Sequence, residues 1–294
     1  MRCDLHVHTR ASGMCNVPWL RRICRESYNE PLETYRTLKA RGMDLVTVTD
    51  HDSIGSVDCL GSMPDFFLGE EVSCRLPSGT RIHVGVYGLQ ERHQSPIEQR
   101  RDDLIRLVHY FFEQRLFFSI NHAFSALTGR RTAEDFHLFG EAFPGVETRN
   151  GHMPARSNGL ATRLAAEHRQ APLGGSDSHT YATLGSTYTE VPGARNAREF
   201  LAGLRLGRGI VHGAHGSYRK LTQVVYEIGM SMMRERGWTR CLFPLALAVP
   251  GVTAVIFAKE MTNSVRWGGS PVPHKFGSAM QASQASSAGL IPKC

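Results

Sequence analysis

The chain has 294 residues, of which 41% are hydrophobic and 21% charged, the composition of a globular protein with a sizeable core. This composition excludes a disordered chain, a collagen and a small disulfide-bonded scaffold. The net charge of +7, from 34 basic and 27 acidic residues, is too small to indicate nucleic-acid binding by itself. The unusual count is that of the 14 histidines, because histidine is the commonest metal ligand in proteins.

The seven cysteines are an odd number and include no Cys-x-x-Cys pair, so we expect reduced thiols rather than a disulfide framework. A first strand is expected directly after Met1, with no apolar signal region before it. Both features lead us to expect a cytoplasmic protein. They indicate nothing about its oligomeric state.

From residue 1 to about 215, short apolar runs alternate with helical patterns, which is typical of βα units. We expect strands at 2–7, 44–49, 65–72, 81–87, 116–121, 145–148 and 172–174. Helices are expected at 31–42, from 95 to about 114, and near 132–139, 157–169 and 196–206. No Gly-x-Gly-x-x-Gly follows the first strand, so the pattern favours an α/β barrel over an open dinucleotide-binding sheet.

Residues 241–258 form an uncharged apolar stretch between Arg240 and Lys259. As a straight helix it would be roughly 27 Å long, slightly short of a hydrocarbon core of about 30 Å. Pro244 and Pro250 would also interrupt that helix. We therefore expect a packed C-terminal element. The alternative is a membrane anchor or re-entrant segment, or peripheral membrane contact, through 241–258.

The chain is thus expected to have three parts. The catalytic barrel is expected over 1–215, a helical and apolar extension over 216–260, and a disordered tail rich in Ser, Gly, Ala, Gln and Pro over 261–294.

Candidate metal ligands recur at the ends of the expected strands or inside one. They are His6, His8, His51, Glu70, Glu71, His83, His122, Asp177 and His179. Residues i and i+2 of a strand share a face, so His6 and His8 can reach one metal. Strand ends meet at one mouth of a barrel. This ordered set indicates a metal site, although each member alone is more simply a structural side chain.

The motifs around these residues resemble those of the PHP (polymerase and histidinol phosphatase) metal-dependent phosphoesterases. They are DLHVHT at 4–9, TDHDS at 49–53, GEEVS at 69–73, His83, His122 and GGSDSH at 174–179. The resemblance covers roughly residues 2–213. It implies a distorted (β/α)7 TIM-like barrel with two or three divalent metals at its mouth.

Carried over to this sequence, the resemblance assigns one metal to His6, His8, Glu71 and Asp177. Glu71 would bridge to a second metal that is held by His83 and His122. Glu71 is preferred to Glu70 because the family pattern is Gly-x-Glu, and Gly69 supplies the glycine.

The family's third metal site uses the histidines that match His51 and His179, together with a ligand from the first loop. This sequence has Gly13 where the family usually has Asp. Glycine has no side chain that could coordinate, so a third metal requires a substitute ligand from residues 14–30.

Mixed imidazole and carboxylate ligands suit Zn, Mn or Fe(II) better than Mg. Two such metals lower the pKa of a bridging water, so the expected nucleophile is a metal-bound hydroxide. We expect Asp50 to orient His51, and Arg10 to bind phosphate as a clamp. Arg149 and Asn150 are expected at the mouth; a solvated loop is the alternative for Arg10, Arg149 and Asn150.

The resemblance implies a phosphoesterase acting on a phosphomonoester or phosphodiester, either a small metabolite or a nucleotide. A 3′–5′ exonuclease and a histidinol-phosphate phosphatase are alternatives, but no basic stripe with interleaved aromatic residues favours nucleic acid. A non-catalytic alternative is a degenerate metal-binding scaffold. An amidohydrolase with a carboxylated lysine is disfavoured, because none of the five lysines lies on a mid-barrel strand.

Overall fold

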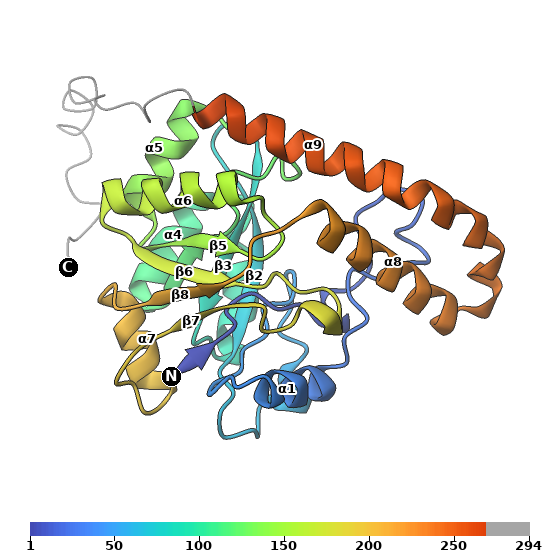
Figure 1. Ribbon diagram of the computed structural model, residues 1–294. Helices are drawn as coiled ribbons and strands as arrows, with labels where there is room; N and C mark the ends of the chain where they lie inside the picture. The colour runs from blue at the N-terminus through green and yellow to red at the C-terminus, as the bar shows by residue number, and fades with distance from the viewer. Residues whose placement is uncertain (269–294) are drawn as a thin grey trace.

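A computed structural model describes residues 1–268 and shows an α/β protein with two sheets (Figure 1). The larger sheet has the strand order β2–β3–β4–β5–β6 and the smaller sheet the order β1–β7–β8. The strands are β1 Arg2–Cys3, β2 Gly69–Arg75, β3 Arg81–Tyr87, β4 Phe117–Ile120, β5 Gly145–Asn150, β6 Ala171–Gly175, β7 Thr187–Glu190 and β8 Ile210–Gly213.

The α/β class is confirmed, but the closed seven-stranded parallel barrel is not shown. Strands β2, β3 and β4 pair antiparallel, and only the pairs β4–β5 and β5–β6 are parallel. A short turn joins β2 to β3, with the Gly79 N–H donating to the Leu76 carbonyl at 2.8 Å, and so tight a connection requires antiparallel strands.

The expected strands 2–7 and 44–49 are mostly irregular. The N–H groups of Val7 and Thr9 donate to the side chains of Thr49, at 3.0 Å, and Asp50, at 2.6 Å. Side-chain oxygens thus take backbone donors that a strand ladder would use. Beyond Arg2–Cys3, which pair with β7, isolated bridges such as Val7–Ser178 and Val46–Phe66 link these segments to their neighbours.

The helices surround the larger sheet (Figure 1). They are α1 Pro31–Ala40, α2 Val57–Leu60, α3 Gln94–Glu98, α4 Leu104–Glu113, α5 Ala133–Ala142, α6 Ala155–His168, α7 Ala197–Arg205, α8 Tyr218–Glu235 and α9 Val249–Gly268, with short 3-10 helices η1 Arg10–Ser12, η2 Glu91–His93 and η3 Tyr181–Thr183 and the longer η4 Gly237–Ala248. The single helix expected from 95 to about 114 is instead two. Asp103 starts α4 by accepting the N–H groups of Ile105 and Arg106 at 3.0 and 3.2 Å.

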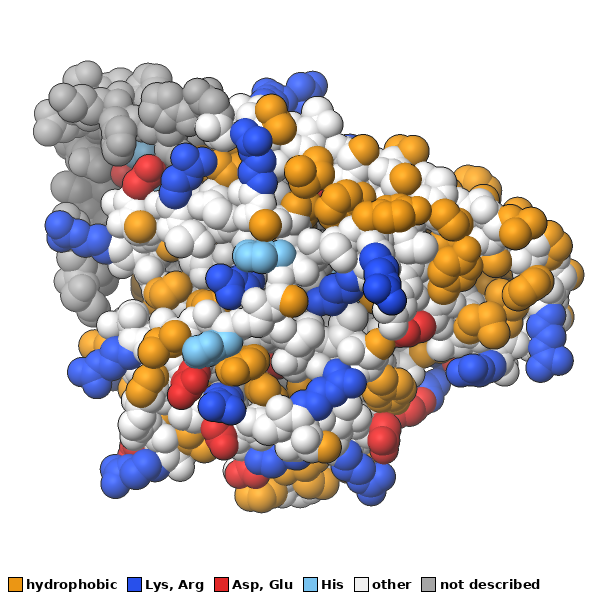
Figure 2. All heavy atoms as spheres, in the orientation of Figure 1, with side chains coloured by type: hydrophobic (Ala, Val, Ile, Leu, Met, Phe, Trp, Pro, Cys, Tyr) orange, Lys and Arg blue, Asp and Glu red, His pale blue; other side chains and the backbone are white. Residues whose placement is uncertain are grey.

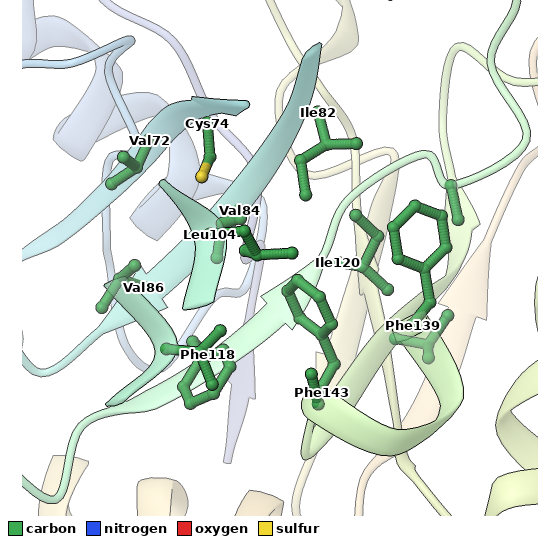
Figure 3. Close-up of a cluster of buried hydrophobic side chains, with 14 of the residues drawn as sticks. Val72, Cys74, Ile82, Val84, Val86, Leu104, Phe118, Ile120, Phe139 and Phe143 are labelled. Atoms are coloured by element: carbon green, nitrogen blue, oxygen red, sulfur yellow. The ribbon is translucent and has the colours of Figure 1, made fainter. Parts of the chain in front are cut away.

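The main hydrophobic core lies between the larger sheet and helices α4, α5 and α6. Val84, Phe118 and Ile120 from the sheet meet Phe139 and Phe143, and all five are almost fully buried (Figure 3). This packing fixes β3, which carries His83, and β4, which leads into His122.

The C-terminal extension is a helical hairpin of α8, η4 and α9, and α9 returns along α6 (Figure 1). Its end is attached to the body of the protein. Glu260 accepts hydrogen bonds from the Ser125 hydroxyl at 2.9 Å and the Ala126 N–H at 3.0 Å, and Trp267 packs edge-on against Phe136. The disordered tail expected from residue 261 is therefore wrong for 261–268, which continue α9, while 269–294 lie outside the described residues.

Candidate metal centre

The carboxylate of Glu71, on β2, is the centre of a buried imidazole cluster. Glu71 has no exposed surface. Its two oxygens lie next to five histidines: His6 Nε2 at 3.1 Å, His51 Nδ1 at 3.1 Å, His122 Nε2 at 3.2 Å, His8 Nε2 at 3.5 Å and His83 Nδ1 at 3.5 Å. Five rings from four separate segments thus converge on one carboxylate, because His6 and His8 share a segment.

Glu70 faces the other side of β2. Burial raises the pKa of Glu70 to about 8, although the neighbouring Gln94 side chain opposes this shift. The structure thus places Glu71, and not its neighbour, among the histidines.

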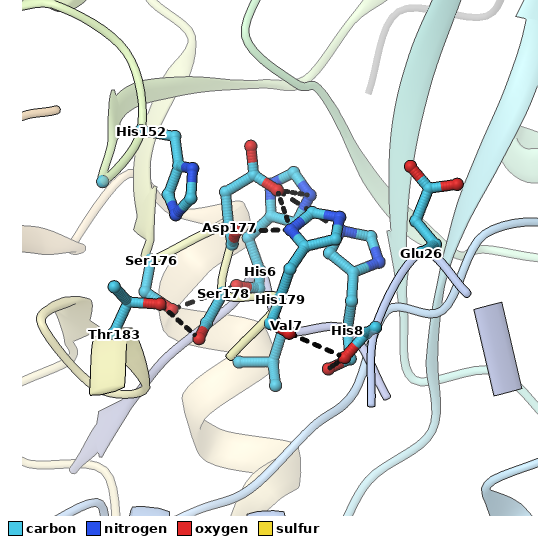
Figure 4. A network of polar contacts seen from close by, with 12 residues as sticks. His6, Val7, His8, Glu26, His152, Ser176, Asp177, Ser178, His179 and Thr183 are labelled. Carbon is cyan, nitrogen blue, oxygen red and sulfur yellow. Dashed lines mark hydrogen bonds and ion pairs between the residues drawn. The ribbon is translucent and has the colours of Figure 1, made fainter. Parts of the chain in front are cut away.

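Asp177 approaches the same cluster from the segment after β6. Its Oδ1 lies 3.4 Å from both His6 Nε2 and His8 Nε2 (Figure 4). The backbone φ of Asp177 is 54° and that of His122 is 28°, strained values for residues with side chains. Gly175 permits the close approach of β6, because a Cβ there would lie 2.5 Å from the His6 nitrogen.

The donor set fits divalent cations. Four groups have ligand atoms within 4.8 Å of one another: His6, His122 and Asp177; His6, His8 and Glu71; His51, Glu71 and His83; and His8, His51 and His179. The Nε2 atoms of His6 and His8 and the Oε2 of Glu71 are buried without any hydrogen-bond partner. Buried lone pairs without donors are unfavourable unless a cation satisfies them.

Burial and neighbouring charges set the protonation of these groups. Burial raises the pKa of Glu71, but the rings of His6, His83 and His51 hold it well below its ordinary value. Burial lowers the pKa of His8 to about 4 and that of His51 well below its ordinary value. The carboxylate is therefore ionised and these two rings are neutral, the states in which such groups coordinate a cation. For His6, burial lowers the pKa but the surrounding carboxylates raise it well above its ordinary value, so a cation would compete with a proton there.

The sequence led us to expect that Asp50 orients His51, but Asp50 does not contact the His51 ring. Its carboxylate accepts the Thr9 N–H at 2.6 Å and the Ser12 hydroxyl at 2.8 Å. The Ser12 oxygen in turn lies 3.2 Å from His8 Nδ1 and accepts the His51 N–H at 3.2 Å. Asp50 therefore fixes the first loop, and it reaches the histidines only through Ser12.

The three residues expected to contact the substrate, Arg10, Arg149 and Asn150, do not lie together in the structure. Arg10 forms ion pairs with Glu30 and Glu235, and Arg149 donates to the Gly213 carbonyl at 3.1 Å, so the structure engages both guanidinium groups outside the cluster. Only Asn150 reaches the cluster, where its amide donates to Asp177 Oδ2 at 3.0 Å. A register shift in β5 between Glu147 and Arg149 breaks the strand alternation and accounts for this difference.

Several residues of the site were missed by sequence reasoning. Glu147 lies 2.8 Å from His6 Nδ1 and accepts the His122 N–H at 2.8 Å, while the Asn121 amide donates to Glu71 Oε1 at 2.9 Å. His152 is half-buried near Asp177, and desolvation lowers its pKa to about 3. The only available signal was for Glu147, which lies at the end of an expected strand, three residues before Asn150.

A cavity of about 380 Å³ lies beside the cluster. It is lined by His179, Tyr28 and Tyr181 on one side and by residues of α8, including Met230 and Arg234, on the other. It offers room for a small molecule next to the histidines.

Residues 155–208 match the family model described as PHP-associated. Among solved structures, PsfC from Pseudomonas syringae is similar, with 16% identity and a TM-score of 0.56 over 79% of this chain and 98% of PsfC. A two-domain protein from Bacteroides vulgatus containing a predicted PHP-like metal-dependent phosphoesterase has 18% identity and a TM-score of 0.55, over 77% of this chain and 69% of its own. The lesion-specific endonuclease PfuEndoQ from Pyrococcus furiosus has 17% identity and a TM-score of 0.51, over 72% and 58%. No curated protein matches the sequence.

Proposed function

We propose that this chain, which has the fold of the PHP-family metal-dependent phosphoesterases, is a divalent-metal-dependent phosphoesterase acting on a small phosphorylated metabolite or nucleotide. The observation that carries the proposal is the convergence of five imidazoles on the buried Glu71 carboxylate. A purely structural role does not account for this arrangement, because the arrangement leaves buried imidazole nitrogens without hydrogen-bond partners.

In this proposal His6, His8, Glu71 and Asp177 hold one cation, and Glu71, His83 and His122 hold another. Such a pair of cations lowers the pKa of a bound water and stabilises the charge of the phosphoryl group. Mixed nitrogen and oxygen donors favour Zn, Mn or Fe(II).

Residues around these ligands keep them in position. The carboxylate of Glu147 beside His6 Nδ1 fixes that nitrogen as the protonated one, so that Nε2 carries the lone pair aimed at Glu71 and Asp177. The amides of Asn121 and Asn150 each donate to one oxygen of Glu71 and Asp177, respectively, and leave the other oxygen free.

The adjacent cavity supports a small substrate. Its volume of about 380 Å³ lies within the range of small-molecule sites. Arg234 on its wall supplies a cationic group suited to phosphate, and Tyr28 and Tyr181 supply flat walls for an organic substituent.

Removal of metal tests the proposal. The full chain, purified without added metal, is expected to contain two or more equivalents of Zn, Mn or Fe by mass spectrometry. It should hydrolyse members of a panel of phosphomonoesters, nucleotides and phosphodiesters. A chelator is expected to abolish hydrolysis, and one of the three metals to restore it. Fewer than one equivalent, with none taken up on reconstitution, would overturn the proposal in favour of a scaffold.

A further inference from the structure

A carboxylate outside the ligand set described above lies next to the imidazole cluster. Glu26 Oε1 is 3.9 Å from His51 Nε2, and the Glu26 side chain is 22% exposed. In Figure 4 Glu26 and His152 lie on opposite sides of the imidazole rings. The ring nitrogens of His8, His51 and His179 lie within 4.8 Å of one another on this side of the site.

The loop after the first histidine pair places Glu26 there. Met14 and Arg25 form an antiparallel bridge, and the Cys15 N–H donates to the Cys24 carbonyl at 3.0 Å. The Glu26 N–H then donates to the Gly13 carbonyl at 3.1 Å. The loop is therefore a hairpin that brings Glu26 beside Gly13, although they are far apart in the sequence.

The conformation of Gly13 explains why this position carries no ligand of its own. Its φ is 80° and its ψ is −144°, a region that residues with side chains rarely adopt. An aspartate at this turn would be strained, whereas a side chain at position 26 enters the site from ordinary backbone.

Two nearby rings have a nitrogen available on this side. His179 Nδ1 lies 2.9 Å from the Asp177 carbonyl, which can only accept, so Nδ1 carries the proton and Nε2 the lone pair. His51 uses Nδ1 toward Glu71 at 3.1 Å, which leaves its Nε2 facing Glu26.

We propose that Glu26, with His51 and His179, holds a further divalent cation beside the pair that shares Glu71. The inference rests on the proposed function, since it extends that metal cluster. What it adds is a ligand supplied by the far end of the 13–26 hairpin, in place of a residue at position 13. Two imidazoles and one carboxylate favour Zn, Mn or Fe(II), and open positions remain for a phosphate oxygen.

Metal content tests the role of Glu26. The wild type is expected to bind one equivalent more than Glu26→Gln, which should keep the pair at Glu71. Glu30→Gln is the matched control, because Glu30 is 55% exposed and pairs with Arg10 instead of the cluster. Glu30→Gln is expected to keep the full complement. Loading with Co(II) gives a second readout: the absorption of one bound ion should be missing in Glu26→Gln only.

Equal metal content in the wild type and Glu26→Gln would overturn this inference and leave the proposed function standing. A wild type that binds fewer than one equivalent would overturn both. Loss of one equivalent in Glu30→Gln as well would also contradict the inference, because the effect would then belong to the loop as a whole.

An independent observation concerns the outer surface of the C-terminal hairpin. Large apolar side chains are exposed there, among them Trp238, Phe243, Leu245, Leu247 and Val255, with Leu247 at 88% and Val255 at 70% exposure. The stretch Gly237–Gly268 has a mean hydropathy of 2.2 in its most apolar window, of which 6% is buried. Figure 2 shows hydrophobic side chains gathered over the end of the α8–α9 hairpin.

The two arms of the hairpin are bonded to each other, and the end of α9 is attached to the body of the protein. Thr222 and Thr253 join α8 to α9 through their hydroxyls at 2.8 Å, and the Tyr226 hydroxyl donates to the Ala246 carbonyl at 3.0 Å. Beyond them Glu260 is buried against Ser125. A membrane would therefore meet the surface of this hairpin.

We infer that the apolar end of the hairpin binds the surface of a bilayer that contains anionic lipids. Charge complementarity specifies this partner: Arg234, Arg236 and Arg240 lie at one border of the apolar stretch and Lys259 at the other, and no acidic residue lies between Gly237 and Lys259. Helices that lie on a membrane surface typically insert apolar side chains into the membrane–water interface and carry arginines and lysines beside them.

Vesicle flotation tests this surface. The wild type is expected to float with vesicles of phosphatidylcholine and phosphatidylglycerol, and less with phosphatidylcholine alone. The double variant Leu247→Glu and Val255→Glu should lose binding. Leu206→Glu is the control, since Leu206 is 65% exposed but directly follows α7, away from the hairpin (Figure 1); it should bind as the wild type does.

Two results would contradict membrane binding. The first is a wild type that fails to float with anionic vesicles. The second is a dimer, seen by sedimentation in the absence of vesicles and lost in the double variant, because this surface would then be covered by a second copy of the chain.

Discussion

Glu71→Ala is expected to remove the bound cations and to lower kcat/KM for any phosphoester by more than about 10³-fold, or about 4 kcal/mol of transition-state stabilisation. The physical reason is the position of Glu71, whose two oxygens lie within 3.5 Å of a nitrogen of each of the five converging imidazoles. Without this carboxylate the rings lose the anion that offsets a cation, and the two metal positions lose their bridge.

Glu70→Gln is the matched control for Glu71→Ala. Both carboxylates lie on β2 and are buried, but Glu70 faces Gln94 instead of the histidines. Metal content by mass spectrometry and hydrolysis should therefore be retained in Glu70→Gln. Full metal content in Glu71→Ala, or an equal loss in both variants, would show that Glu71 is not the centre of the site.

The histidines could be predicted from the sequence because their spacing follows local geometry. His6 and His8 are two residues apart, as are Asp177 and His179, and such pairs project to one side of an extended segment. The structure brings these four together with His51, His83 and His122 around Glu71. That convergence does not require a closed parallel barrel. Strands β2 and β3 are antiparallel, yet Glu71 Oε2 and His83 Nδ1 lie 3.5 Å apart, and the Asn121 N–H at the end of β4 donates to the His83 carbonyl at 3.1 Å.

The rest of the site depends on contacts that a sequence does not reveal. Arg149 was expected at the mouth because it follows a predicted strand, but a register shift in β5 turns it toward Gly213. Glu26 had no strand or motif to mark it, because its position is set by the hairpin that pairs it with Gly13. Long-range pairing decides both cases, and local pattern does not encode it.

The same limit applies to the helices. The capping-box pattern at 95–98 predicted one helix to about residue 114, yet Asp103 caps a second helix inside this range. Asp103 accepts two backbone N–H groups and so starts α4.

Glu147→Gln is expected to weaken metal binding by about 10- to 100-fold while leaving the ligands themselves unchanged. The Glu147 carboxylate lies 2.8 Å from His6 Nδ1 and accepts the His122 N–H and the Asn150 amide at 2.8 and 3.0 Å. A glutamine of the same size has one acceptor oxygen in place of two. It cannot hold both His6 and His122, and it no longer raises the basicity of the His6 ring.

Competition with a chelator measures this effect as a metal dissociation constant, and the activity should recover to within a few-fold of the wild type at saturating metal. Glu141→Gln is the control, since Glu141 also pairs with a histidine, His137, but on an exposed helix face. Its metal affinity should equal that of the wild type. An unchanged affinity in Glu147→Gln, together with lost activity at saturating metal, would mean that Glu147 acts on the substrate and does not position His6.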